Sequence, residues 1–170
     1  MPNSLSNPTA LHPFYPLIKQ TGLDLQYTGE ATIWKLETIY RDTQAKDYSA
    51  LTVGFEHTLP AINEAGADLG LLAEYHHDSR GENSTAVFQN DLFLGARLAL
   101  NDEAGSELLA GAVVDIDNQS QSLRIEASRR FKDGLKANLE VQWFTNVDNN
   151  APSFSLRNDD FIKLDVQKFF

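Results

Sequence analysis

The sequence contains no cysteine, and it has few basic residues for its length of 170. Without cysteine the chain forms neither disulfides nor thiolate metal sites. Lys and Arg total 14 against 24 Asp and Glu, which gives a formal net charge of -10. A nucleic-acid partner requires clustered positive charge to replace phosphate counterions, so this composition argues against nucleic-acid binding.

Long apolar runs are also missing. The longest clear one is Leu108–Val114, whereas a membrane-spanning helix needs roughly 20 apolar residues. Mean hydropathy is -0.34. These values exclude helical membrane spans, but they do not exclude membrane strands, because such a strand exposes only alternate side chains to lipid.

The segment Met1–Gln20 lacks a basic start followed by an apolar core, and it carries Pro2, Pro8, Pro13 and Pro16. It is therefore not a secretory signal. Proline is poorly suited to a strand ladder because it lacks the backbone N–H donor. We expect residues 1–20 to be an irregular segment, and any export signal to lie upstream of it.

What the chain does have is strict alternation of apolar and polar residues. Every position from Leu135 to Trp143 obeys it, and a helix would scatter these apolar side chains around its circumference. Most of the segments with this pattern are 8–12 residues long, nearer the ~9–11 of a membrane strand than the ~5–6 of a soluble one. The pattern predicts nine strands at about 21–28, 31–41, 48–59, 67–77, 91–100, 106–117, 121–131, 135–145 and 159–170.

The connections between these strands alternate in length. Those around 29–30, 60–66, 101–105 and 132–134 are short, whereas the stretches near 78–90 and 146–158 are long and polar. Bacterial barrels place short turns in the periplasm and longer loops outside the cell. The fold class we predict is all-β: an antiparallel up-and-down transmembrane β-barrel over residues 21–170, with a periplasmic C-terminus. Bacterial barrels have an even strand number, so nine strands predict an incomplete part of a larger barrel whose residues 1–20 are the remnant of an extracellular loop.

The final segment, Asp159–Phe170, sets Ile162, Leu164, Val166 and Phe170 against polar residues and ends on an aromatic side chain. It resembles the C-terminal strand of Gram-negative outer-membrane β-barrel proteins, which closes with an aromatic residue. The resemblance implies recognition by the barrel-assembly machinery through these four residues. Lys168 departs from the pattern, since that site is usually apolar or aromatic, and its stem can reach the headgroups at the periplasmic rim.

Alternation divides the strand residues between two predicted faces. The face toward outer-membrane lipid includes Leu23, Leu25, Trp34, Leu36, Val53, Phe55, Leu69, Leu71, Leu94, Leu98, Ala112, Val114, Ile125, Leu139 and Val141. Aromatic residues near strand ends predict an interfacial girdle of Tyr27, Tyr40, Tyr75, Phe131 and Trp143, with Phe170 at the terminus. The alternative is a soluble barrel with the apolar set inside.

The opposite face is predicted to line the lumen with Lys35, Glu37, Glu56, Glu74, Arg97, Arg124, Glu126, Arg130, Lys136, Glu140, Gln142, Lys163 and Asp165. These residues either select solutes by charge or neutralise one another in a closed barrel. Cross-strand ion pairs are expected among Arg124, Glu126, Lys136 and Glu140.

Other reactive residue types give no specific pattern. His76 and His77 are adjacent on a strand, so they point to opposite faces and do not share a metal. His76 with Glu74 makes half of an acid–base pair, although both are also ordinary rim residues. Acidic loop residues Asp148, Asp159 and Asp160 suit either Ca²⁺ or solvent.

The sequence therefore predicts a porin-like channel for small solutes in the bacterial outer membrane, with no catalytic residues, metal or cofactor. The alternatives are a non-transporting barrel with an ion-paired lumen, an outer-membrane enzyme and a soluble ligand-binding barrel. The sequence does not predict an oligomeric state.

Overall fold

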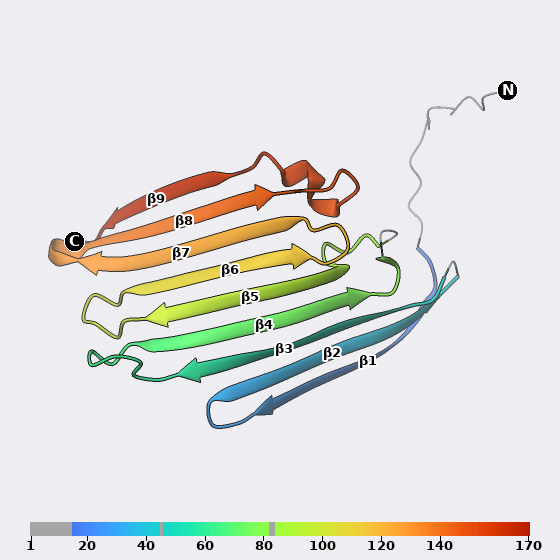
Figure 1. The fold of residues 1–170 in the computed structure, drawn as a ribbon, viewed down its shortest axis with the longest axis horizontal. Coiled ribbons are helices and arrows are strands. Elements are labelled where there is room, and N and C mark those ends of the chain that lie inside the picture. Colours follow the sequence, from blue (N-terminus) through green and yellow to red (C-terminus); the bar gives the residue numbers. More distant parts are fainter. Residues whose placement is uncertain (1–14, 45, 82–83) are drawn as a thin grey trace.

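The computed structural model describes residues 15–44, 46–81 and 84–170, which form a single sheet (Figure 1). Its nine strands pair in sequence order, each antiparallel to its neighbours. The all-β, antiparallel, up-and-down fold expected from the alternation is thus confirmed. The strands are β1 (Ile18–Thr28), β2 (Thr32–Thr43), β3 (Tyr48–Leu59), β4 (Asp68–Asp78), β5 (Asn90–Ala99), β6 (Glu107–Asp115), β7 (Gln121–Phe131), β8 (Leu135–Thr145) and β9 (Phe161–Lys168).

The first strand is longer than the sequence indicated. It begins at Ile18, so the last three residues of the segment expected to be irregular are paired with β2. Lys19 lies opposite Asp42 and Gln20 opposite Arg41, and this polar stretch lacks the alternation that marks the other strands. Residues 1–14 of that segment lie outside the described residues.

The two ends of the sheet carry different connections. At the end that we call the turn end lie 29–31, 60–67, 100–106 and 132–134, the last being the short 3-10 helix η2 (Lys132–Gly134). At the opposite end, the loop end, lie 44–47, 79–89, 116–120 and 146–160, the last containing the 3-10 helix η3 (Pro152–Leu156). The two longest connections are both at the loop end, as predicted, although 44–47 and 116–120 are short.

The sheet is a single layer and has no apolar core. In the described part of the chain the buried apolar residues are Tyr48, Ala67 and Ala151, and no large side chain is fully buried. A sheet normally buries its apolar face against a second layer. None of the described segments supplies that layer.

The sheet is also open. Among the described residues β1 pairs only with β2 and β9 only with β8, and every residue of β1 is exposed. Both edges therefore present unpaired backbone N–H and C=O groups. No helix in the described ranges is long and apolar enough to cross a membrane.

Candidate functional site

The register sorts the strand residues onto two chemically different faces. Residues directly opposite one another in neighbouring strands share a face, so each row can be followed across the sheet. The apolar face is defined by the rows that contain the predicted lipid-facing residues. One of its rows, from β1 to β8, consists of Tyr27, Trp34, Phe55, Ala73, Leu94, Ala112, Leu123 and Trp143.

Charge on the apolar face is confined to strand ends. Within the described strands its charged side chains are Lys19, Asp42, Arg129 and Lys168, each within three residues of the end of its strand. Lys168 lies in the same row as Phe131 and Leu135 at the turn end, and its ammonium group donates to the carbonyl oxygen of Asp133. The central rows are therefore uncharged, and their side chains range from half-buried to exposed.

The predicted girdle aromatics all lie on the apolar face. Tyr27 and Phe131 are near the turn end, whereas Tyr40, Tyr75 and Trp143 are nearer the loop end. The Tyr75 hydroxyl donates to the Asn90 side chain across 2.8 Å. Aromatic residues of the apolar face thus lie near both ends of the strands.

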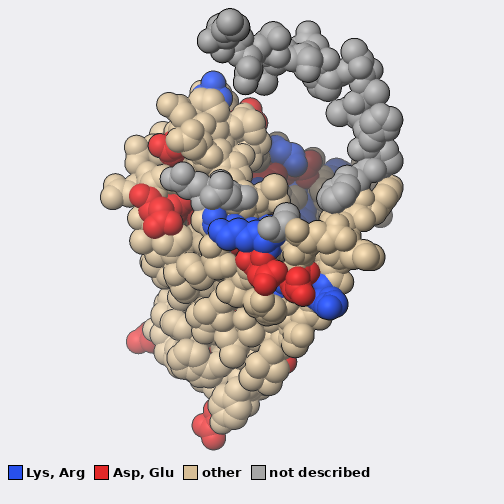
Figure 2. Space-filling model, turned by 90° about the vertical axis from the view of Figure 1, so that its right-hand side faces the viewer, with Lys and Arg blue, Asp and Glu red and all other residues tan. Residues whose placement is uncertain are grey.

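The second, polar face holds every residue predicted to line a lumen: Lys35, Glu37, Glu56, Glu74, Arg97, Arg124, Glu126, Arg130, Lys136, Glu140, Gln142, Lys163 and Asp165. The view onto the loop end shows acidic and basic side chains gathered in and around a recess, beside a flank that is almost uncharged (Figure 2).

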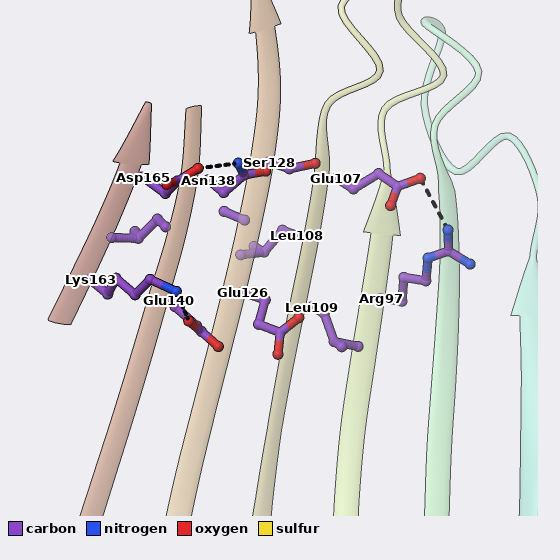
Figure 3. Close-up of a pocket in the computed structure, with 12 residues that line it drawn as sticks. Arg97, Glu107, Leu108, Leu109, Glu126, Ser128, Asn138, Glu140, Lys163 and Asp165 are labelled. Atoms are coloured by element: carbon purple, nitrogen blue, oxygen red, sulfur yellow. Dashed lines mark hydrogen bonds and ion pairs between the residues drawn. The ribbon is translucent and has the colours of Figure 1, made fainter. Parts of the chain in front are cut away.

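An ion-pair network crosses three strands of the polar face. Arg124 on β7 donates to Glu126 across 2.6 Å and to Glu140 on β8, and Lys163 on β9 lies 3.3 Å from Glu140. Glu126, Glu140 and Lys163 border an open hollow of about 270 Å³ that extends to the Arg97–Glu107 pair (Figure 3). The charged groups of this network are 28–64% exposed, so each pair contributes about 1 kcal/mol or less.

Lys136 does not join this network, contrary to the expectation. It lies directly opposite Arg130, another cation, at the turn end of β7 and β8. The rows put these two residues nearer the turn end than Arg124 and Glu140, which is why the expected pairing fails. Instead, Lys163 supplies the second cation.

No family model, curated protein or solved structure matches this chain.

Polar groups on β2 to β4 form smaller contacts. Lys35 pairs with Glu56, and His76 accepts or donates a 3.1 Å hydrogen bond with the Thr52 hydroxyl. The His76 ring nitrogen Nε2 is 3.7 Å from Glu74, too far for a hydrogen bond. His77 lies on the apolar face, so the two histidines do point to opposite sides, as predicted. Among the described residues no group of three or more metal-ligating side chains occurs.

Sequence reasoning missed an aromatic platform on the polar face. The Phe93 ring lies over Gly95 of its own strand and Gly111 of β6, where a β-carbon would approach the ring to less than 3.0 Å. With Leu109 and Val113 it borders a hollow of about 260 Å³ next to Arg124 and Glu126. The signal in the sequence was an aromatic residue two positions before a glycine, since that spacing puts both on one face.

At the loop end, an arginine side chain contacts both a carboxylate and an aromatic ring. Arg80 donates to the Asp78 carboxylate at 2.9 and 2.6 Å, and its guanidinium lies 3.7 Å from the centre of the Tyr48 ring. The hydrogen bonds to Asp78 raise the pKa of Arg80 above its ordinary value. These contacts fix the start of the 79–89 connection against β3.

Proposed function

We propose that this sheet is part of the wall of a bacterial outer-membrane β-barrel that acts as a porin-like channel for small solutes. The observation that carries the proposal is the pair of faces: one exposed, apolar and uncharged in its centre, the other charged. In lipid the apolar face needs no second protein layer, because hydrocarbon covers it. The absence of an apolar core among the described residues agrees with this environment.

The open edges support closure into a barrel. A spanning sheet must satisfy all its backbone groups, since the hydrocarbon core offers no hydrogen-bond partners. β1 and β9 run in the same direction, because eight antiparallel pairings separate them. An up-and-down barrel that contains this sheet is therefore closed by an odd number of further strands.

The proposed orientation puts the turn end in the periplasm and the loop end outside the cell. The long connections 79–89 and 146–160 lie at the loop end, in keeping with longer extracellular loops. β9 ends at the turn end, and its Ile162, Leu164 and Val166 project from the apolar face. We propose that these residues, with Phe170, are read by the barrel-assembly machinery.

Membrane location is tested with the two tryptophans. Trp34 and Trp143 both lie on the apolar face and are 52% and 58% exposed. Folded into phosphatidylcholine vesicles with brominated acyl chains, the protein should lose most of its tryptophan fluorescence relative to unbrominated vesicles. Unchanged fluorescence in the presence of bound vesicles would contradict the membrane barrel and favour a soluble sheet.

Transport is tested by planar-bilayer conductance of the full barrel. Discrete open-channel currents are expected from a pore. A second candidate, the non-transporting barrel, is favoured by the Arg124–Glu126–Glu140–Lys163 network, which can close a narrow lumen. If brominated lipid quenches the tryptophan fluorescence but the protein carries no current, the pore is excluded and the non-transporting barrel remains.

A further inference from the structure

A third hollow, of about 220 Å³, lies at the loop end between the 79–89 and 146–160 connections and the polar face. Its walls are largely apolar: Val87 and Phe88 come from one connection, Pro152 and Leu156 from the other, and Phe144 from β8. The Phe88 ring stacks on His76 of β4 with ring centres 4.9 Å apart. Described residues of both connections, among them Phe88 and Leu156, are therefore folded against the sheet and enclose this hollow.

Two carboxylates form part of the lining of this hollow. Asp91 on β5 and Asp115 on β6 are directly opposite in the register, and they are only 4% and 8% exposed. Neither forms a salt bridge within the described ranges. Like charges directly opposite in a sheet are destabilising, so the pair costs stability. His76 of β4 lies directly opposite Asp91 on its other side, where a positive charge on the ring favours the carboxylate.

The two carboxylates differ in which of their oxygen atoms accept hydrogen bonds. Both oxygens of Asp115 accept hydrogen bonds, from the backbone of Asp117 and Asn118 and from the Asn118 side chain. Asp91 uses only Oδ2, which accepts from the backbone N–H of Gln89 at 2.6 Å and of Asn90 at 3.1 Å. These two bonds hold the carboxylate in place. Its Oδ1 accepts no hydrogen bond from any described residue.

We infer that this hollow binds a small organic ammonium ion with an apolar or aromatic body. The ammonium group donates to Asp91 Oδ1, and the positive charge relieves the repulsion between Asp91 and Asp115. The apolar body packs against Phe88, Phe144 and Leu156, where the aromatic faces also attract a cation. Anions are repelled by the two carboxylates. This inference deepens the proposed channel function by naming a solute class at the outer entrance.

Binding is measured by isothermal titration calorimetry of benzylammonium chloride into the full chain folded in detergent micelles. Saturable binding to a single site is expected, with no saturable heat from benzyl alcohol or sodium benzoate. Asp91→Asn keeps an oxygen for the two backbone N–H groups but removes the charge, so affinity should fall about tenfold or more. Asp42→Asn is the matched control, because it removes a carboxylate at the loop end of the apolar face and should bind like the wild type.

Phe88→Ala provides a second variant should Asp91→Asn fold poorly. It leaves every charge in place and removes one of the two phenylalanine side chains that line the hollow, so affinity for benzylammonium should also fall severalfold. Equal binding of benzoate, or unchanged affinity in both Asp91→Asn and Phe88→Ala, would overturn the inference. Since micelle binding needs no channel, a negative bilayer recording with normal benzylammonium binding would refute the pore alone.

Discussion

The backbone N–H of Phe169 donates a 2.8 Å hydrogen bond to the carbonyl oxygen of Gly134, joining the end of β9 to the turn before β8. Gly134 has φ of +71°, and a β-carbon there would collide with the carbonyl oxygen of Phe169. Gly134→Ala should therefore destabilise the protein by more than the ~1–2 kcal/mol of left-handed strain alone. Urea unfolding of the vesicle-folded protein measures the loss.

Gly66→Ala is the control for this variant. Gly66 has a similar φ of +77°, but a β-carbon there meets nothing within 4 Å. The difference between the two variants isolates the collision with Phe169. Equal losses for Gly134→Ala and Gly66→Ala would show that the contact at the C-terminal end does not matter to stability.

A charge in the centre of the apolar face should oppose membrane folding. Leu94 is 54% exposed and lies between Ala73 and Ala112 in a wholly apolar row. Leu94→Arg is expected to reduce the free energy of folding into vesicles by about 2–4 kcal/mol, because the guanidinium enters hydrocarbon. Ser122→Arg adds the same group to the polar face and should cost far less. Equal costs for the two variants would speak against a lipid-facing apolar surface.

Removal of Arg124 separates an open lumen from one closed by ion pairs. Arg124→Ala leaves Glu126 without its partner and leaves Glu140 with Lys163 alone. Because the guanidinium is 47% exposed, stability should change by about 1 kcal/mol or less. In a lumen closed by the network, single-channel current should appear or rise in the variant. In an open pore, conductance should change little, while reversal potentials in a salt gradient shift toward greater cation selectivity.

The turn at residues 100–106 should loosen in acid. The Asp102 carboxylate accepts hydrogen bonds from the backbone N–H and the hydroxyl of Ser106 at 2.7 and 2.8 Å. These bonds, aided by the charge of Arg129, lower the pKa of Asp102 below its ordinary value of 3.8. A carboxyl group whose pKa is lowered on folding stabilises the folded protein at pH values above its unfolded-state pKa. This stabilisation is lost as the pH falls through the folded-state pKa.

Amide hydrogen exchange at Gly105 and Ser106 measures this effect. Once corrected for intrinsic exchange rates, protection should be full above pH 5 and should decline below pH 4. Asp102→Asn should flatten the profile, because the amide oxygen still accepts hydrogen bonds but does not titrate in this range. A wild-type profile that is already flat would refute the proposed role of Asp102.

Alternation predicted most of the sheet because a strand with two different environments must repeat with period two. It sorted Lys35, Arg124 and Asp165 onto one face before any pairing was known, and the register places them there. The start of β1 was missed because Lys19 and Gln20, which follow Ile18, put polar side chains on both faces. The ion pairs expected for Lys136 do not form because Lys136 lies in a row nearer the turn end than Arg124 and Glu140. Alternation predicts the face on which a residue lies but not its row.

The hollow that Asp91 lines could not be predicted from the sequence, for a different reason. It depends on two connections that fold back onto the sheet, and alternation carries no information about the path of a loop. Phe88 and Leu156 are remote in sequence and converge only through such paths. The period of a strand predicts which side chains share a face, whereas a site at the end of a sheet depends on loop geometry.

Pairing between strands that are adjacent in sequence has a consequence for how the chain folds. Every ladder in the described sheet joins a strand to the next one along the chain, so each hairpin closes only a short stretch of polypeptide. Short closures cost little chain entropy and form quickly, and a completed hairpin provides the edge on which the next strand docks. Assembly can therefore proceed strand by strand from either edge, with each addition moving the exposed backbone one position along the sheet.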